Sequence, residues 1–519
     1  MQRTAISMWQ LLLFLFHGSA VVSAVVQSVV VSLDRPKAVT SPNFLGVNID
    51  AASLYQGTRL DFRDPQLRTL ACRFGTVGDG PMTLRLGGSS ADDLSTFVNN
   101  VEDGEIYLTA DYWDDLIDFV ETCGFNLAWD LNMRVGRYND PRQKWNPQDA
   151  QRLLDHIKAK QQRVYAFQLG NEPGHYQTRN GGLPTADEHE QDFLTLAHIL
   201  GSHYHGSADE LPRMQGPDVC LGEGTNASPC ANISYFRDIL HVIGPDLLQD
   251  VTGHAYGLRG PKKGRAEPSQ CNIESFLSVA TFSHTVTSAV AAWKQVLDEM
   301  APDANFVLSE TASTADGGCP GLSNRFIAGF YFMEILGELG DMGVYQVYRQ
   351  DLVGYGGINF ASSYALFDPP GWYSTKSHGV LMPNPDYFTG LLYRKLVGPT
   401  RLPVKSNNPT NYIHAACAVG GGIVMTYINP SSELLHINFT IVLTKRSASV
   451  CRSMDRLGPG GTELYILTAP GGNLTSNKVR LNGKILNASS PLVGVSYSEE
   501  NVTMPPYSYG FVVRRNAIS

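Results

Sequence analysis

Eight short apolar segments, spread over about 350 residues, constrain the fold of this chain more than any other feature. Between most of them, apolar residues recur at helical spacing, as in 112–123, 290–300 and 326–339. Strands that alternate with helices form parallel sheets, and eight such units are typical of a closed barrel. We therefore expect an α/β fold, a (β/α)8 TIM barrel with enlarged loops. Its strands are predicted at 44–49, 82–86, 126–131, 165–169, 211–215, 250–254, 305–309 and 343–348.

The chain changes character near Leu402, after which short β-type segments follow one another without helices. A Gly-Gly-Gly turn at 420–422 separates the first two. We expect an attached antiparallel β-sandwich with strands at 412–419, 423–428, 435–443, 463–467, 478–486 and 508–513. The strand-like segment 26–33 has no partner in the predicted barrel, so we expect it to join the sandwich. The predicted organisation is a signal peptide at 1–24, an N-terminal sandwich strand at 25–40, a catalytic barrel at 41–395 and the β-sandwich at 396–519.

The first residues have the pattern of a signal peptide for secretion. Arg3 precedes an apolar stretch at 9–16, and the small residues at 22–24 suit cleavage. The stretch is short for a membrane span, and an uncleaved anchor is the alternative. We expect a secreted or lumenal glycoprotein with no stable membrane span after cleavage. Its Asn-x-Ser/Thr sites are Asn226, Asn232, Asn438, Asn473, Asn487 and Asn501.

Cysteine spacing and net charge limit the classes of function. The eight cysteines contain no Cys-x-x-Cys pair, so we expect structural disulfides or buried thiols and no metal site. Cys220 and Cys230 are near enough in sequence to close one loop. The net charge of −9 comes without long runs of like charge, which argues against binding nucleic acid and against a general attraction to polyanions. No metal or organic cofactor is expected.

Two of the predicted strands end in a glutamate. The fourth is followed by Gly-Asn-Glu-Pro, which contains Glu172, and the seventh by Glu310. The two lie 310 − 172 = 138 residues apart, and units of roughly 44 residues place them after strands four and seven. A TIM barrel carries its active site at the carboxyl ends of its strands, so both are expected at one mouth. Two carboxyl groups that face one sugar are what hydrolysis of a glycosidic bond requires; a polar surface turn is the alternative for Glu172.

The two glutamates are expected to play different parts. For hydrolysis with retention, Glu172 would be the acid/base and Glu310 the nucleophile, ~5–5.5 Å apart. We expect Glu172 in a dry environment rich in carboxylates, which would raise its pKa, and Glu310 beside hydrogen-bond donors. Asn171 is suited to bind the sugar 2-OH, and Tyr256 to donate a hydrogen bond to Glu310. For His254, at the end of the sixth strand, a satisfied core histidine is the alternative.

These residues resemble those of the heparanase-type endo-β-glucuronidases, glycoside hydrolase family 79 of clan A. The shared motifs are Leu-Arg-x-Gly-Gly at 84–88, Gly-Asn-Glu-Pro at 170–173, Gly-Pro-Asp at 216–218, Val-Thr-x-His-x-Tyr at 251–256, Ser-Glu-Thr at 309–311 and Arg-Gln at 349–350. The resemblance implies a retaining barrel hydrolase with a β-sandwich and a glucuronic acid in the cleaved subsite. It implies that the backbone near Asp316, Gly317 and Gly318 meets the glucuronate carboxylate. The side chains that it places in this subsite are Asp50, Ser89, Asn171, His254, Tyr256 and Gln350.

The chain departs from the family pattern at several positions. Ala315 or Asp316 stands where an aromatic residue usually precedes the glycines, and the loop 354–359 does not align with the family's tyrosine-bearing loop. The short segment 88–111 predicts a single-chain enzyme that needs no excision of a linker peptide. No lysine or arginine follows Asp218 up to residue 234, so we expect weak heparin binding.

The expected substrate is accordingly a β-glucuronide-containing glycan or a small glucuronide. The small basic cluster Lys262, Lys263 and Arg265 is expected to be a solvated turn as readily as a binding patch. The alternatives are a clan relative that cuts a neutral β-glycoside, and a catalytically silent carbohydrate-binding matrix protein.

Overall fold

The computed structural model describes most of the chain. The described residues are 24–54, 60–97, 106–134, 144–179, 184–204, 211–221, 233–243, 247–261, 270–357, 360–368, 381–408, 412–442, 450–451, 461–498 and 501–515. The segment up to residue 23, which is predicted to be a signal peptide, lies outside this part, and so do Cys230 and the basic cluster at Lys262, Lys263 and Arg265.

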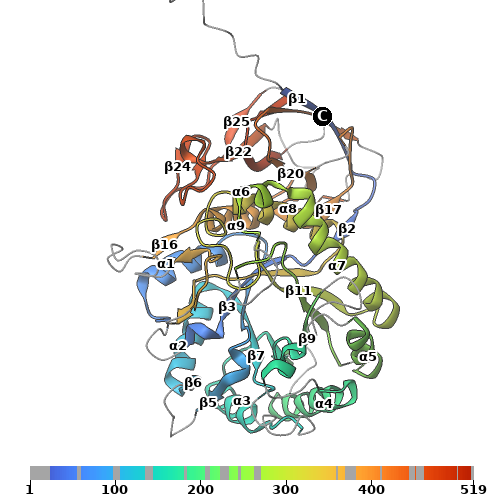
Figure 1. The fold of residues 1–519 in the computed structure, drawn as a ribbon, viewed down its shortest axis with the longest axis vertical. Helices are drawn as coiled ribbons and strands as arrows, with labels where there is room; N and C mark the ends of the chain where they lie inside the picture. The colour runs from blue at the N-terminus through green and yellow to red at the C-terminus, as the bar shows by residue number, and fades with distance from the viewer. Residues whose placement is uncertain are drawn as a thin grey trace, which may run out of the picture.

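Eight parallel strands close into a barrel in the lower half of the view in Figure 1, as the sequence predicts. The strand order is β10-β11-β12-β3-β4-β7-β8-β9, which is the chain order followed once around the barrel. Every strand is buried along most of its length, as expected where helices cover the outside of the barrel. The barrel strands are β3 (Leu45–Asp50), β4 (Met82–Gly87), β7 (Phe125–Leu131), β8 (Ala166–Leu169), β9 (Arg213–Cys220), β10 (Asp250–His254), β11 (Asn305–Thr311) and β12 (Gln346–Arg349).

The helices around the barrel begin and end where the local chemistry dictates. Helix α2 begins after Thr109, whose side chain accepts a hydrogen bond from the Tyr112 N–H, and ends at Gly124 in the left-handed conformation. Helix α4 begins with a capping box between Thr185 and Glu188. The helices are α1 (Pro65–Gly75), α2 (Ala110–Cys123), α3 (Gln148–Lys160), α4 (Ala186–His203), α5 (Ile233–Ile243), α6 (Ile273–Leu277), α7 (Val279–Met300), α8 (Ala328–Asp341) and α9 (Pro385–Leu396).

Short elements decorate the loops. They are the pair β5 (Leu94–Thr96) and β6 (Ile106–Leu108), the pair β13 (Gly356–Gly357) and β14 (Phe360–Ala361), the pair β15 (Phe367–Asp368) and β16 (Met382–Pro383), and the 3-10 turns η1 (Ala51–Leu54), η2 (Ala91–Asp93), η3 (Pro173–Arg179) and η7 (Pro470–Gly472). Of these, η2 and η3 follow barrel strands and border the barrel mouth.

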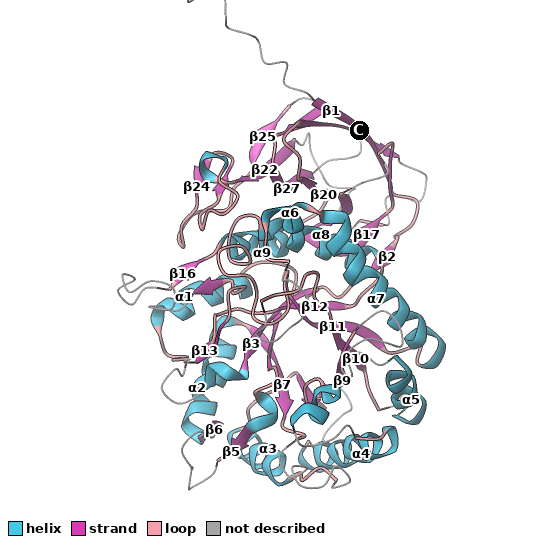
Figure 2. Cartoon of the chain, viewed as in Figure 1, coloured by secondary structure: helices cyan, strands magenta, loops and turns pink. Residues whose placement is uncertain are grey.

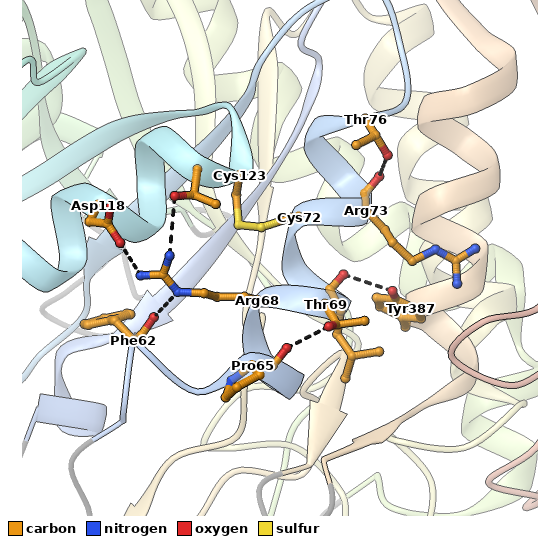
Figure 3. The surroundings of a disulfide bond; sticks show 12 residues. Phe62, Pro65, Arg68, Thr69, Cys72, Arg73, Thr76, Asp118, Cys123 and Tyr387 are labelled. Atoms are coloured by element: carbon orange, nitrogen blue, oxygen red, sulfur yellow. Dashed lines mark hydrogen bonds and ion pairs between the residues drawn. A yellow bond between two sulfur atoms is a disulfide. The ribbon is translucent and has the colours of Figure 1, made fainter.

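Disulfides join neighbouring elements of the fold. Cys72 and Cys123 connect α1 to α2, and Figure 3 shows Arg68 of α1 reaching Asp118 of α2 beside that bond. Further disulfides are Cys271–Cys319 and Cys417–Cys451, and Cys220 is also disulfide-bonded. No free cysteine occurs among the described residues.

Apart from the short strand pairs in the loops, the strands outside the barrel form two stacked sheets at the top of the view in Figure 2. One sheet has four strands in the order β18-β1-β21-β26, and the other has nine. The four-stranded sheet comprises β1 (Ala24–Ser32), β18 (Val404–Ser406), β21 (Leu434–Val442) and β26 (Asn501–Met504). The nine-stranded sheet comprises β2 (Ala38–Val39), β17 (Val397–Leu402), β19 (Ile413–Ala418), β20 (Ile423–Asn429), β22 (Thr462–Thr468), β23 (Arg480–Leu481), β24 (Lys484–Ile485), β25 (Val495–Tyr497) and β27 (Ser508–Arg514).

Two details of these sheets differ from the sequence prediction. Strand β1 pairs with β21 in parallel from Ala24 to Ser32, so the sandwich is not wholly antiparallel. The segment expected to be one strand at 478–486 is a hairpin of β23 and β24. Its turn is Asn482-Gly483, where both residues have positive φ, the pair that two-residue hairpin turns favour.

Both faces of the central strands β19, β20 and β27 of the nine-stranded sheet are buried. Alternate residues of β20 point to opposite sides: Met425 and Tyr427 face the core between the two sheets, whereas Val424 and Ile428 pack into the barrel's own core. Helix α8 lies against the second face. A Cβ at Gly329 of this helix would lie 2.1 Å from the Tyr509 hydroxyl, so the glycine leaves room for the tyrosine ring.

A buried group of charged residues lies at this junction. His414 of β19 contacts Asp341 through Nδ1 at 3.0 Å and Glu334 through Nε2 at 3.4 Å, and both carboxylates belong to α8. Lys37 also contacts Asp341, at 2.8 Å. We call His414, Glu334, Asp341 and Lys37 the seam cluster. Burial alone would lower the pKa of His414, but its hydrogen bonds to the two carboxylates raise it to about 10.

Candidate active site

The two glutamates meet at the carboxyl ends of the barrel strands. Glu310 belongs to the end of β11, and Glu172 follows β8 after a turn. One carboxylate oxygen of each glutamate and one imidazole nitrogen of His254 lie within 4.8 Å of one another. That separation suits a nucleophile and a proton donor on one sugar, and it is too short for the water that an inverting enzyme places between its carboxyl groups.

The turn after β8 is held in an unusual backbone conformation. Gly170 has φ +79, and a Cβ there would lie 2.6 Å from the Tyr176 hydroxyl. Glu172 itself has φ +48, which side-chain-bearing residues rarely adopt. Its N–H donates to the Asp218 carbonyl at 3.0 Å, and its carbonyl accepts from the His175 N–H at 2.8 Å. The turn therefore projects the Glu172 side chain into the mouth.

Each carboxylate oxygen of Glu172 contacts an imidazole. Oε1 is 3.0 Å from His254 Nδ1, and Oε2 is 2.8 Å from His175 Nδ1. Burial would raise the pKa of Glu172, but the hydrogen bonds and charges of the two histidines hold it well below its usual range. The expectation of a raised pKa for Glu172 is therefore wrong for the free protein, because the imidazoles of His254 and His175 face this carboxylate.

Glu310 has the donor-rich environment that the sequence predicts. Oε2 accepts from Arg85 Nη1 at 3.1 Å, and Oε1 accepts a short hydrogen bond from the Tyr256 hydroxyl. Both partners stabilise an ionised carboxylate, which is the form that a nucleophile needs. The raised pKa of Tyr256, caused by burial and by the charge of Glu310, keeps its proton on the phenol oxygen.

Arg85 is the central cation of the site. From the sequence it was recognised only as part of a family motif, and no role was predicted for it. It lies on β4 with a fully buried guanidinium that donates to four side chains besides Glu310. These contacts are to Gln168 at 2.6 Å, Asn171 at 2.9 Å, Asp218 at 3.0 Å and Asp130 at 3.5 Å. A buried arginine inside a strand is the available signal, since such a charge persists only when carboxylates surround it.

His254 joins the two glutamates electrostatically. Its Nε2 lies 3.5 Å from Asp218, and its Nδ1 lies 3.8 Å from Glu310 as well as close to Glu172. Burial favours the neutral ring, but the charge of Glu310 and the bonds to Asp218 and Glu172 raise the pKa of His254 to about 10. Burial would raise the pKa of Asp218, but Arg85 and His254 hold it low. From the sequence, Asp218 was recognised only as part of the Gly-Pro-Asp motif.

The other residues expected in the subsite lie around this centre. Gln350 donates to Asp50 at 3.1 Å, and Gly88 makes room for the Asp50 carboxylate, which a Cβ would approach to 2.7 Å. Burial raises the pKa of Asp50 to about 7. Asn171 is buried and fixed by Arg85. Ser89 is half-buried, in the turn that follows β4.

The glycine-containing loop after β11 packs against a second loop that carries tyrosines. Asp316, Gly317 and Gly318 all have positive φ, so this backbone is suited to glycine. The Gly317 carbonyl accepts from the Ser363 N–H at 2.6 Å, and the Gly318 N–H donates to the Ala315 carbonyl at 3.3 Å. Of the N–H groups expected to meet a uronate, that of Gly318 is thus engaged in a turn.

Tyr364 and Tyr355 supply aromatic surface at this place. Their hydroxyl groups are 3.0 Å apart, and burial raises the pKa of both phenols. Besides burial, the charges of Asp351, Glu310 and Asp50 raise the pKa of Tyr364. Neither tyrosine was predicted, because the 354–359 loop did not align with the family pattern.

The described residues of the barrel mouth include possible metal ligands, but the positive charge beside them disfavours a bound cation. Glu172, His254 and Glu310 lie near enough to share an ion. The guanidinium of Arg85 is already 3.1 Å from Glu310, and a cation held there would face it directly. The geometry thus favours acid/base and nucleophilic chemistry by side chains.

Comparisons with known proteins agree with this geometry. Residues 81–337 match the model of "Glycosyl hydrolase family 79, N-terminal domain". The chain is 26% identical over 549 residues to heparanase of Mus musculus, covering 93% of this chain and 92% of that protein. It is 26% identical over 425 residues to hyaluronoglucuronidase of Hirudo nipponia, covering 79% of this chain and 77% of that protein.

A solved structure shares the fold. The 4-O-α-L-rhamnosyl-β-D-glucuronidase of Fusarium oxysporum 12S superposes with a TM-score of 0.61 at 15% identity, over 93% of this chain and 100% of that one. The barrel, the paired glutamates and the matched family model lead to one assignment. Residues 81–337 belong to glycoside hydrolase family 79, and the chain is a retaining glycoside hydrolase that is similar to the heparanases.

Proposed function

We propose that this protein hydrolyses β-glucuronosyl linkages, in a glycan or a small glucuronide, with retention of configuration. The observation that carries the proposal is the approach of Glu172, His254 and Glu310 to within 4.8 Å at one barrel mouth. The sugar class is supported by the relatives that the chain is similar to: heparanase, hyaluronoglucuronidase and, in Scutellaria baicalensis, baicalin-beta-D-glucuronidase.

The first chemical step forms a glycosyl-enzyme. Glu310, ionised beside Arg85 and Tyr256, attacks the anomeric carbon while the bond to the leaving oxygen breaks. Glu172 donates its proton to that oxygen. Because the two histidines favour the Glu172 carboxylate, a proton has to reach it before this step, and a negatively charged or water-excluding substrate favours that transfer.

The second step releases the sugar. Glu172, now a carboxylate, accepts a proton from water while the water oxygen attacks the anomeric carbon and the bond to Glu310 breaks. Asn171, oriented by Arg85 and by the bond from its N–H to Asp92 at 3.1 Å, is placed to bind the sugar 2-OH in both steps.

A panel of aryl glycosides that differ only in the sugar tests the proposal. The expected result is turnover of the aryl β-glucuronide with β-glucuronic acid as the first product, seen by proton NMR before mutarotation. Turnover of another sugar alone would contradict the uronate assignment, and an α-configured first product would contradict the retaining mechanism.

A neutral sugar is the second candidate, because two carboxyl groups at the subsite would repel a uronate when they are ionised. Asp50 and Asp351 are both buried at the subsite, and burial holds the pKa of each above its ordinary value. An ionised carboxylate there opposes a uronate, whereas the protonated acid can donate to it. A glucuronidase of this kind should therefore bind its substrate more tightly below pH 7, and the panel should be run at pH 5 and pH 8.

We further propose that the protein acts outside the cell or in a lumenal compartment. The disulfides support an oxidising compartment, and Asn473, Asn487 and Asn501 expose their side chains for glycosylation. Among the described residues, no helix is both long and apolar enough to span a membrane. Detection in the culture medium with a mass that falls on treatment with an N-glycosidase would test this, and weak, salt-sensitive retention on heparin is expected.

A further inference from the structure

His175 contacts the acid/base but has no part in the two steps above. It lies three residues after Glu172 in η3, and in a 3-10 turn residues three apart lie above one another. Its Nδ1 is 2.8 Å from Glu172 Oε2. The His175 side chain is 37% exposed, whereas that of His254, on the other oxygen, is 1% exposed.

The position of His175 is fixed by the neighbouring residue. The Tyr176 hydroxyl donates to Asp92 at 2.8 Å, and the same Asp92 oxygen accepts from the Asn171 N–H at 3.1 Å. One buried carboxylate thus ties the residue before Glu172 to the 3-10 turn after it. These two hydrogen bonds therefore hold His175 and Glu172 in a fixed position relative to each other.

The two oxygens of Glu172 face different surroundings. Oε1 faces His254, behind which lie Asp218 and Glu310, with Arg85 bound to both. Oε2 faces His175. Tyr256 adds its phenol on the side of Glu310, and Cys220, which is near His175, is disulfide-bonded and does not titrate. Among the described side chains around Glu172, His175 is accordingly the titratable group that lies between this carboxylate and solvent.

We propose that His175 is a positioning residue that shares one proton with Glu172 and exchanges it with solvent. Before the first step the proton moves from His175 Nδ1 to Glu172 Oε2, and Glu172 then donates it to the leaving oxygen. In the second step the proton taken from water returns through Glu172 to His175, so each turnover consumes only water. The inference depends on the retaining mechanism, and on the proposed function only for the choice of sugar.

The test compares pH profiles of kcat/KM for His175→Ala and His175→Asn with that of the natural protein. Asparagine keeps an N–H donor near the place of Nδ1 but cannot exchange a proton at working pH. Each profile is measured with a nitrophenyl and a phenyl β-glucuronide, because only the poor phenolate leaving group needs a strong proton donor. His203→Gln is the matched control, since His203 contacts Asp155 at 2.9 Å far from the mouth.

In both His175 variants we expect the basic limb of the profile to move up by about one pH unit, because Glu172 loses a cationic partner that holds its pKa down. We expect kcat for the phenyl glycoside to fall about tenfold, with little change for the nitrophenyl glycoside. His203→Gln should leave both unchanged.

An asparagine variant with the natural profile would reduce His175 to a hydrogen-bond donor and overturn the proposal, and so would an unshifted limb in both variants. If the natural protein cleaves an aryl glycoside of a different sugar, the proposed function fails. The same profiles, measured on that glycoside, still decide the role of His175.

Discussion

Two histidines of this molecule are each held between carboxylates, one at the barrel mouth and one at the seam. His254 lies among Glu172, Asp218 and Glu310, and His414 lies between Glu334 and Asp341. In both places the carboxylates raise the pKa of the histidine to about 10 against the effect of burial. The local electrostatics are therefore alike, and they do not by themselves distinguish a catalytic cluster from a structural one.

The two clusters differ in what else can reach the carboxylates. The side chains of Glu334 and Asp341 are 2% and 7% exposed and lie between a helix and a sheet. Those of Glu172 and Glu310 are 13% and 10% exposed and lie at strand ends, beside an arginine and on a turn with positive φ. Carboxylates that a substrate can approach become reagents, whereas sealed ones can only hold two elements together.

The largest expected effect comes from the nucleophile. Glu310→Ala should lower kcat for any aryl glycoside substrate by about 10⁴-fold or more, because no covalent intermediate can form. A native circular dichroism spectrum should show that the variant is folded, because Arg85 keeps its contacts to Asp130 and Asp218. Near-normal turnover would place the chemistry elsewhere.

Glu172→Gln should separate the acid role from the base role. For phenyl glycosides, which need the proton, we expect a loss of about 10²–10⁴-fold in kcat/KM, and for nitrophenyl glycosides less than about tenfold. Added azide should restore turnover of the nitrophenyl glycoside by replacing the water that Glu172 activates. Equal losses for both leaving groups would contradict an acid role.

His414→Gln should affect stability and leave catalysis alone. Removing the cation leaves Glu334 buried without its partner and Asp341 with Lys37 alone, at a cost of about 3 kcal/mol in the free energy of unfolding. Urea unfolding gives this quantity, and kcat per folded molecule should be unchanged. A loss of kcat at full folding would mean that the seam and the mouth communicate.

The pH dependence of stability should report the same histidine. The folded pKa of His414, about 10, is raised above its ordinary value of 6.5. Its contribution to stability is thus fully present below pH 6.5 and is lost as the pH rises toward 10. Between pH 6 and pH 9 the natural protein should lose more stability in urea than His414→Gln does. Parallel curves would contradict a charged His414 in the folded state.

The smallest effect is expected at the rim of the seam. Lys37 contacts Asp341 at 2.8 Å, but its side chain is 45% exposed, so solvent screens the pair. Lys37→Met should cost about 0.5 kcal/mol, measured by urea unfolding in low salt, and the difference should shrink at high salt. An effect as large as that of His414→Gln would show that Lys37, and not the histidine, is the main partner of Asp341.

Much of the barrel could be predicted from the sequence, and all eight barrel strands are confirmed. Strand lengths were less certain: β9 extends to Cys220, beyond the predicted 215, because Gly216 and Pro217 read as a turn. The hairpin at Asn482-Gly483 carries a recognisable turn pair that the prediction passed over. The parallel pairing of β1 with β21 has no local signal, since about four hundred residues separate the partners.

At the site, the sequence predicted which carboxylates meet but not their electrostatics. Glu172 and Glu310 follow apolar strands, so the barrel topology alone brings them together. The low pKa of Glu172 depends on His254 from β10 and on His175 from η3, whose approach is a matter of side-chain direction. Arg85 was hidden for a related reason, because a strand that is buried on both faces shows no alternation to reveal which residues point into the barrel.

The glycines of α8 have a consequence for anyone who would divide this molecule. Three glycines of α8 leave room for side chains of the nine-stranded sheet: Gly329 for Tyr509, Gly337 for His414 and Gly340 for Arg401. A Cβ at any of these glycines would lie within 2.4 Å of the side chain that packs there. A barrel truncated at residue 396 would leave the space at these glycines unfilled and would expose the apolar side of α8 to solvent. The C-terminal β-sandwich is therefore not a separable domain that can be exchanged between enzymes. Expression of the barrel or of the sandwich alone should yield insoluble chain.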